Sequence, residues 1–196
     1  MNEPEVLPPW KAVAMDVIAR LDFLTLTTGN YIRWIGGDIP PDVVDDGKDL
    51  QSVVDVVERN CQVCLLGAAI LSKARVMDAV PANKVITRYG GITLRTEKAA
   101  DLLTGVFERS DCALMESAYE MNARFAREYF GPDGGQIDKG LVYGAAVFGA
   151  KVGPVREDRV RAVMENVLAN GGRFVPPTAT LEEWYATTVE DEKDGE

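Results

Sequence analysis

Two of the chain's three cysteines, Cys61 and Cys64, have the C-x-x-C spacing found in zinc sites and in redox-active thiol pairs. A structural zinc ion needs four ligands, usually cysteine and histidine, and this chain has no histidine. A redox-active pair usually lies where a strand leads into a helix N-terminus, because the helix dipole there lowers the pKa of a thiol. Apolar residues before and after the pair recur at helical spacing, which places both cysteines in the middle of a helix. The sequence therefore predicts two small buried side chains on a packed helix face.

Carboxylates are the remaining candidates for catalysis, because histidine, the most common general base, does not occur. Ser-His-Asp and Cys-His arrangements are excluded for the same reason. Glu116 and Glu120 lie four residues apart, so on a helix they face the same side and could hold Mg²⁺. A solvated helix face is the more common outcome for such a pair. We therefore assign no catalytic residue, no metal ligand and no cofactor.

A basic cluster around Gly90 and Gly91 is the best candidate for a ligand site. Two β-rich runs flank this glycine pair, which predicts a β-hairpin over residues 85–95. Thr96 suits the cap of a following helix, and helix N-termini attract anions. Arginine can bind a phosphate or a carboxylate through two parallel hydrogen bonds. A solvent-facing hairpin with ordinary surface arginines is the alternative. The anion site that we expect consists of Lys84, Arg88, Arg95, Thr96 and Lys98.

The acidic composition narrows the class of partner. The chain has 196 residues and a formal net charge of −10, with the excess of acidic side chains near its two ends. An acidic protein is repelled by a polyphosphate backbone, so we do not expect general nucleic-acid binding. No apolar run approaches the length of a membrane span, and the acidic, proline-bearing start differs from a signal peptide. An odd number of cysteines argues against a secreted disulfide framework. We expect a cytoplasmic protein without a membrane partner.

Helical periodicity covers most of the chain. The run from 49 to 78 is predicted to be one long helix that contains the C-x-x-C pair, with a break near Asn60 as an alternative. Tyr31, Trp34 and Ile35 are expected to pin a loop onto the core. A helix that carries Ala99, Leu102, Leu103 and Val106 is expected after the cap at Thr96. The other predicted helices span residues 9–26, 111–130, 141–150 and 155–169.

These elements predict a mainly α fold, a single-domain helical bundle with one β-hairpin. Residues 1–8 form a flexible lead in this interpretation, and residues 9–180 form the helical domain with the hairpin at 85–95. Residues 181–196 carry seven acidic side chains and one lysine, so we expect an acidic, disordered C-terminal tail.

Two stretches, ERNCQVCLLGAAILSKARVMD and VRAVMENVLANGGRFVP, resemble small uncharacterised proteins of bacteriophages and prophages. Those proteins carry a C-x-V-C-A-x-G-A helix and end in an I-x-x-N-G-G-x-F-x-P pattern. The resemblance covers about a third of the chain, and Leu65 stands where that helix has alanine. It implies a phage or prophage setting, in which small acidic helical proteins modulate host proteins or sequester host signals. It transfers no catalytic residue to this chain.

We therefore expect a non-enzymatic binding protein that engages a host protein or sequesters a small anionic, nucleotide-like ligand. If the protein is phage-encoded, it acts in the host cytoplasm, and assembly into a homo-oligomer stays open. One alternative is a metal-dependent enzyme that acts on a nucleotide through Glu116 and Glu120. A structural or assembly protein of a phage is the other alternative.

Overall fold

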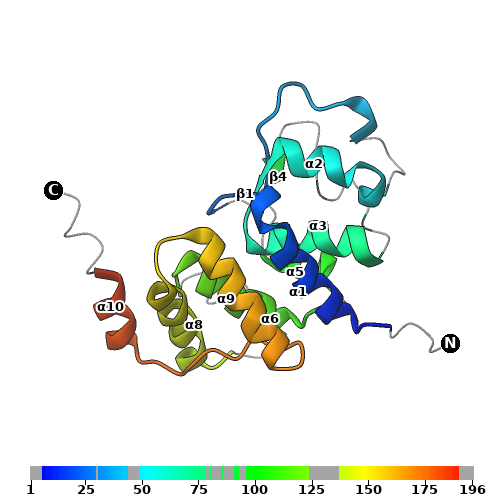
Figure 1. The fold of residues 1–196 in the computed structure, drawn as a ribbon. Coiled ribbons are helices and arrows are strands. Elements are labelled where there is room, and N and C mark those ends of the chain that lie inside the picture. The colour runs from blue at the N-terminus through cyan, green and yellow to red at the C-terminus, as the bar shows by residue number, and fades with distance from the viewer. Residues whose placement is uncertain are drawn as a thin grey trace.

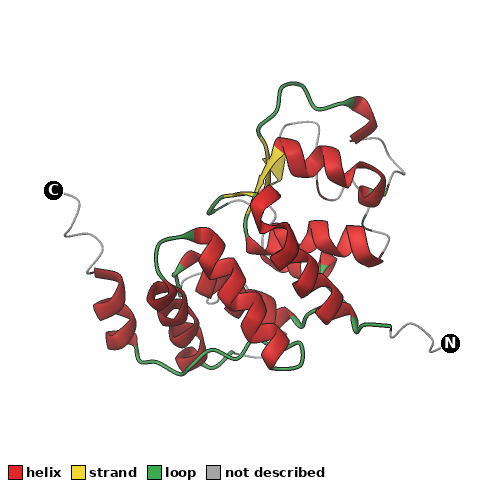
Figure 2. Ribbon diagram, viewed as in Figure 1, coloured by secondary structure: helices red, strands yellow, loops and turns green. Residues whose placement is uncertain are grey.

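The protein has a mainly α fold with one small β-sheet, as the sequence predicts (Figures 1 and 2). The computed structural model describes residues 6–29, 31–43, 49–77, 80, 85, 91–92, 96–123 and 137–189. The helices are α1 (Pro9–Arg20), α2 (Val54–Asn60), α3 (Leu65–Met77), α5 (Thr96–Leu102), α6 (Arg109–Glu120), α8 (Lys139–Val152), α9 (Arg156–Ala169) and α10 (Leu181–Val189). The strands are β1 (Thr25–Leu26), β2 (Ile32–Trp34), β3 (Cys61–Val63) and β4 (Gly91–Ile92).

The helices pack around one contiguous cluster of buried hydrophobic side chains. Helix α1 packs against α3 on one side and α9 on the other, while α6 packs against α8, and α10 lies at the outer side of α8 (Figure 1). Among the described residues, no helix is both long and apolar enough to cross a bilayer.

The sheet joins segments that are far apart in the chain. Its strand order is β1-β3-β2-β4, with β1 parallel to β3 and the other neighbours antiparallel. Gly91, expected in the hairpin turn, lies in β4 opposite Arg33 of β2. Val85, the first residue of the predicted hairpin, is helical and buried, so the hairpin does not begin there as expected. Most of the run 86–95 lies outside the described residues, so the other arm of the hairpin stays a prediction.

The prediction of one unbroken helix over residues 49–78 is wrong, whereas the alternative of a break near Asn60 is confirmed. A 3-10 turn at Leu50–Val53 leads into α2, which ends at Asn60, and the chain then forms strand β3 before α3 begins at Leu65. Cys61 is the first residue of that strand, and Cys64 directly precedes α3. Helical spacing continues across the cysteines because three strand residues are too few to disturb the apolar pattern. Pairing with β1 and β2 decides the conformation here, and it is not visible in local sequence.

Three other predictions also need correction: the ends of two helices and the conformation of one loop. Helix α1 ends at Arg20 rather than at residue 26, and the chain continues through a 3-10 turn (Leu21–Phe23) into β1. The expected loop at Tyr31 and Trp34 contains strand β2. Helix α6 ends at Glu120 rather than at residue 130, because Met121 adopts a left-handed conformation with φ 55°.

The start of the predicted disordered tail is also wrong, since residues 181–189 form helix α10. Thr180 and Glu183 make a reciprocal capping box: the amide of Glu183 donates to the Thr180 hydroxyl, and the amide of Thr180 donates to the Glu183 carboxylate. Trp184 is buried and stacks on Tyr143 of α8, with ring centroids 5.7 Å apart. The acidic residues 190–196 lie outside the described part.

The last two long helices match their predictions closely. Asp138 caps α8 by accepting a hydrogen bond from the amide of Gly140. Helix α9 ends in a glycine cap, in which the amide of Gly172 donates to the carbonyl of Val167. Phe174 is buried, and its ring packs against that of Phe148 in α8.

Glycines allow α8 to approach its neighbours through backbone contact. A side chain at Gly149 would collide with the carbonyl of Ala118 in α6, and one at Gly144 would collide with the carbonyl of Pro177. Helix α8 is therefore held against α6 on one face and against the extended segment 173–180 on another.

Replacing Gly149 with alanine should lower the free energy of unfolding by about 3 kcal/mol, because the added Cβ must push α6 and α8 apart. Gly37→Ala is the matched control, since an added Cβ there meets no atom within 4 Å. Urea unfolding of both variants checks this expectation. A Gly149→Ala variant as stable as Gly37→Ala would show that the two helices are not packed as described.

Candidate functional site

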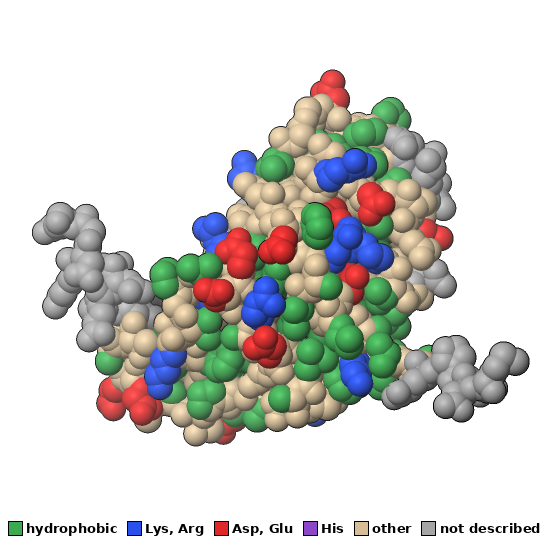
Figure 3. All heavy atoms as spheres, viewed as in Figure 1, with side chains coloured by type: hydrophobic (Ala, Val, Ile, Leu, Met, Phe, Trp, Pro, Cys, Tyr) green, Lys and Arg blue, Asp and Glu red, His purple; other side chains and the backbone are tan. Residues whose placement is uncertain are grey.

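Most of the predicted anion site falls outside the described residues. Lys84, Arg88 and Arg95 lie there, so their grouping stays a prediction. Thr96 begins α5 as expected, and Lys98 is exposed on the same helix. On the face drawn in Figure 3, acidic and basic side chains lie interspersed rather than in one large patch of either sign.

Glu116 and Glu120 both lie on α6, but each contacts a different group. Glu116 is buried, and its carboxylate accepts a hydrogen bond from the hydroxyl of Tyr31. Glu120 accepts a hydrogen bond from the amide of Gly29 at 2.9 Å. Burial raises the pKa of Glu120, while the Gly29 amide and nearby arginines oppose the rise. In the described part of the chain, no three side chains of metal-ligand type lie together.

The same end of α6 is tied to α9 by a buried arginine. Arg159 is only 2% exposed, and its guanidinium donates to the carbonyls of Tyr119, at 2.8 Å, and Gly153, at 2.6 Å. The Tyr119 carbonyl lies at the end of α6, and the Gly153 carbonyl directly follows α8. Neither carbonyl therefore has a hydrogen-bond partner within a helix. Burial lowers the pKa of Arg159. These contacts indicate that the charge of Arg159 serves to join α6, α8 and α9.

The cysteines are buried, as predicted, although not within a helix. All three are free thiols, and Cys61 and Cys64 are 1% and 2% exposed. Strand β3 leads through Cys64 into α3, which is the setting of many redox pairs. Burial nevertheless raises the pKa of Cys61 to about 12. Burial and the nearby Glu116 also raise the pKa of Cys64 well above its usual range. Amides at the start of α3 oppose this rise without cancelling it.

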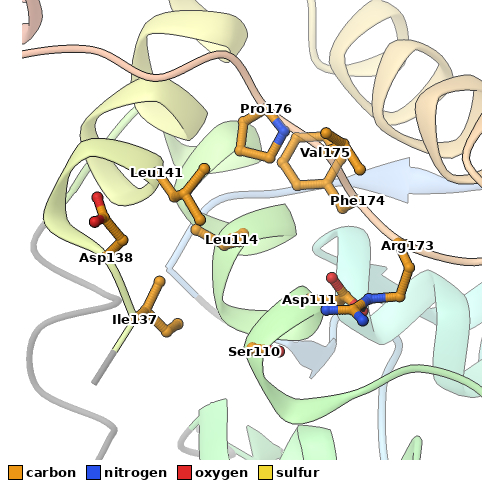
Figure 4. A pocket seen from close by; sticks show the side chains of 10 residues that line it. All are labelled: Ser110, Asp111, Leu114, Ile137, Asp138, Leu141, Arg173, Phe174, Val175 and Pro176. Carbon is orange, nitrogen blue, oxygen red and sulfur yellow. Dashed lines mark hydrogen bonds and ion pairs between the residues drawn. The ribbon is translucent and has the colours of Figure 1, made fainter. Parts of the chain in front are cut away.

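A cavity of about 550 Å³ lies where the first turns of α6 and α8 meet the segment after α9 (Figure 4). Its walls are mostly apolar, with Leu114 and Leu141 between two polar ends. Asp138 lies at one end, and the pair of Asp111 and Arg173 lies at the other. The full lining is Ser110, Asp111, Leu114, Ile137, Asp138, Leu141, Arg173, Phe174, Val175 and Pro176.

Asp111 and Arg173 form an ion pair that joins α6 to the segment after α9. The Arg173 Nε donates to the Asp111 carboxylate at 2.7 Å, and its Nη atoms lie 3.2–3.3 Å from the carboxylate of Glu108. The Asp111 side chain is 2% exposed, whereas that of Arg173 is 52% exposed. Burial raises the pKa of Asp111, and Arg173 opposes the rise without cancelling it.

Two anchors fix the wall that carries Arg173. Asn166 of α9 binds the backbone of Val175 in both directions, donating to its carbonyl at 3.0 Å and accepting from its amide at 2.9 Å. Phe174 is buried, and its ring meets Phe148 edge-on at 5.5 Å. The backbone of this wall is thus held in place, while about half of the Arg173 side chain is exposed to solvent.

Sequence reasoning missed this cavity. The sequence predicts only that Asp111 begins a helix, and it predicts no role for Arg173, because the two residues lie 62 positions apart. The available signal was an acidic residue in a helix's first turn together with an arginine placed directly after a glycine cap.

A scan against protein-family models found no match, and searches of curated proteins and of solved structures found no significant match either. The phage resemblance therefore stays a prediction, and the cavity has to be interpreted from its own geometry.

Burial of the thiols predicts slow labelling of the native protein. With a pKa of about 12, roughly one Cys61 thiol in ten thousand is ionised at pH 8, and only the thiolate reacts. A chromogenic disulfide reagent should therefore modify Cys61 and Cys64 slowly in buffer and within seconds in denaturant. Fast labelling without denaturant, or stoichiometric zinc in the purified protein, would contradict this assignment.

Arg173→Gln should destabilise the protein by about 2 kcal/mol at pH 7, because it leaves Asp111 buried without its cation. Asp111 has a raised pKa in the folded state, so the folded protein favours the protonated carboxyl, and this preference grows without Arg173. The deficit relative to wild type should therefore shrink as pH falls from 7 toward 4.

Urea unfolding at pH 7 and at pH 4.5 measures this deficit. Arg161→Gln is the matched control, because Arg161 is exposed on α9 and the substitution removes the same charge. An equal loss of stability at both pH values would mean that Arg173 acts through packing rather than through Asp111.

Proposed function

We propose that the protein is a non-enzymatic binding protein that takes a small ligand into the cavity between α6, α8 and residues 173–176. The supporting observation is the cavity itself, because its volume of about 550 Å³ falls within the roughly 300–1,000 Å³ of ligand pockets. Apolar walls with a few placed polar groups are also typical of such pockets. The walls come from helices and from an anchored segment, so the pocket is formed before a ligand arrives.

The carboxylate geometry favours binding over the metal-dependent alternative. That alternative needs Glu116 and Glu120 to share a ligand. Glu116 instead accepts from the side-chain hydroxyl of Tyr31, and Glu120 accepts from the backbone amide of Gly29, two different residues of the β1–β2 loop. Both carboxylates therefore help to join α6 to this loop.

The more specific parts of the expected function rest on the sequence alone and remain proposals. A host partner and a phage setting rest on the resemblance, and a homo-oligomer rests on the apolar helical spacing around Cys61 and Cys64. The anionic ligand rests on the predicted cluster of Lys84, Arg88 and Arg95. The cavity offers a second place for a ligand, and its own chemistry indicates a different class.

Leu141→Trp should abolish ligand binding while leaving the fold intact, because Leu141 lines the cavity and is only partly buried. A thermal-shift screen of wild type with nucleotides, divalent metals and small amines, acids and alcohols identifies ligands. Each one is then tested on Leu141→Trp. Ligands of the cavity should raise the melting temperature of wild type and lose this effect in the variant.

Leu168→Trp is the matched control, since Leu168 is a partly buried leucine of α9 that does not line the cavity. It should keep the full ligand effect. Ligands that stabilise Leu141→Trp as much as wild type bind elsewhere and would count against the cavity, as would a screen without any binding compound.

A further inference from the structure

Among the residues that the structure describes, the charged side chains lining the cavity are two carboxylates and one guanidinium. Asp111 and Asp138 face it from the first turns of α6 and α8, and Arg173 lies beside Asp111 (Figure 4). Glu108 adds a third carboxylate on the outer side of Arg173. The described side chains around the cavity therefore carry an uncompensated negative charge.

Arg173 is poorly placed to attract an anion. Its Nε is bonded to Asp111 and its two Nη atoms lie beside Glu108, so an incoming anion would compete with two carboxylates. The helix N-termini offer little more. Asp111 lies in the first turn of α6 and offsets its dipole, and Asp138 accepts from the amide of Gly140 at the start of α8.

Asp111, in contrast, is well placed to attract a cation, because it is a buried carboxylate whose one paired cation is half exposed. The side chain of Asp111 is 2% exposed, against 52% for Arg173 and 62% for Glu108. The link between Arg173 and Glu108 is thus a surface pair in solvent, which Arg173 can keep when it leaves Asp111. The raised pKa of Asp111 is consistent with this, since it shows that Arg173 compensates burial only in part.

On the basis of the binding function proposed above, we infer that the cavity takes a small organic cation that pairs with Asp111. Its ammonium group takes the place of the Arg173 guanidinium, and its apolar part packs against Leu114, Leu141 and Phe174. Arg173 then turns outward and stays paired with Glu108.

Arg173 acts in this arrangement as an internal competitor for the ligand. Its backbone is fixed by the anchored segment 174–175, but its long side chain already has half of its surface in solvent, so turning outward requires no movement of the fold. The competition makes a specific prediction, because removing Arg173 should strengthen the binding of a cation. An anion that binds through Arg173 would respond in the opposite direction.

Three probes of the same shape separate the possibilities: phenethylamine, phenethyl alcohol and 3-phenylpropionate. Each joins a phenyl ring through two carbons to a terminal group that is cationic, neutral or anionic at pH 7. Titration monitored by amide NMR spectra of the full-length protein gives both the affinity and the place of binding. We expect phenethylamine to bind at least about fivefold more tightly than the alcohol and to shift the amide signals of α6, α8 and residues 173–176.

Arg173→Gln should raise the affinity for phenethylamine at least about fivefold and leave that for the alcohol unchanged, whereas Arg161→Gln should change neither. Circular dichroism first establishes that the variant is folded. If it is not, Asp138→Asn decides the question. It keeps the helix cap, removes a charge at the cavity, and should lower the affinity for the amine about twofold or more without affecting the alcohol. Asp158→Asn on the exposed first turn of α9 is its control.

The outcomes distinguish the two proposals. If none of the three probes binds in the cavity, the proposed binding function fails. If the alcohol binds as tightly as the amine, or the propionate binds best, the cavity is a binding site but not one for a cation. An amine affinity that falls in Arg173→Gln, or stays unchanged in both folded variants, overturns the competition at Asp111.

Discussion

The close backbone contact between α6 and α8 is the constraint on which the candidate site depends. Gly149 lies against the carbonyl of Ala118, so the two helices touch in their C-terminal halves without intervening side chains. Their first turns line one cavity, which means that the helices run in the same direction and that the cavity lies at the end away from this contact. The segment after α9 closes the remaining side, because Gly144 lets Pro177 approach α8 equally closely.

Buried charge is distributed unevenly over the molecule, and this unevenness singles out the cavity. Glu58 of α2 is 5% exposed and is paired with Arg20 of α1 and Arg75 of α3, whose side chains are 29% and 20% exposed. Arg159 is buried and donates to backbone carbonyls. Both charges are enclosed by their partners and connect helices. Asp111 differs from these two charges, since the side chain of its paired cation, Arg173, is 52% exposed to solvent.

Periodicity predicted the elements whose conformation is decided locally. Helices α8 and α9 have regular apolar spacing and clear end signals, namely Asp138 before the first and the glycine pair after the second, and both form close to their predicted bounds. The stretch from 49 to 78 failed because its middle is a strand of three residues. Such a strand is stabilised by pairing with β1 and β2, and its partners lie about 30 residues or more away in the chain.

The candidate site could not be predicted from the sequence for a related reason. Motif reading searches for reactive residues at short spacing, and it found Cys61 with Cys64 and Glu116 with Glu120. Burial removes the reactivity expected of the thiols, and the carboxylates are engaged by the loop between β1 and β2. The chemistry of the cavity comes instead from two residues of ordinary type brought together by the fold.

Asp111 gains its character from burial, and Arg173 gains its position from the glycine cap that turns the chain after α9. Neither residue is unusual alone, because acidic residues are common in a helix's first turn and arginines are common after a helix end. What distinguishes the pair is the asymmetry of exposure between its members. A carboxylate held deep in a wall and a guanidinium free to leave it form a site whose occupant can be exchanged. The cavity beside them supplies the apolar surface that a replacement cation needs in order to compete with an arginine that is already in place.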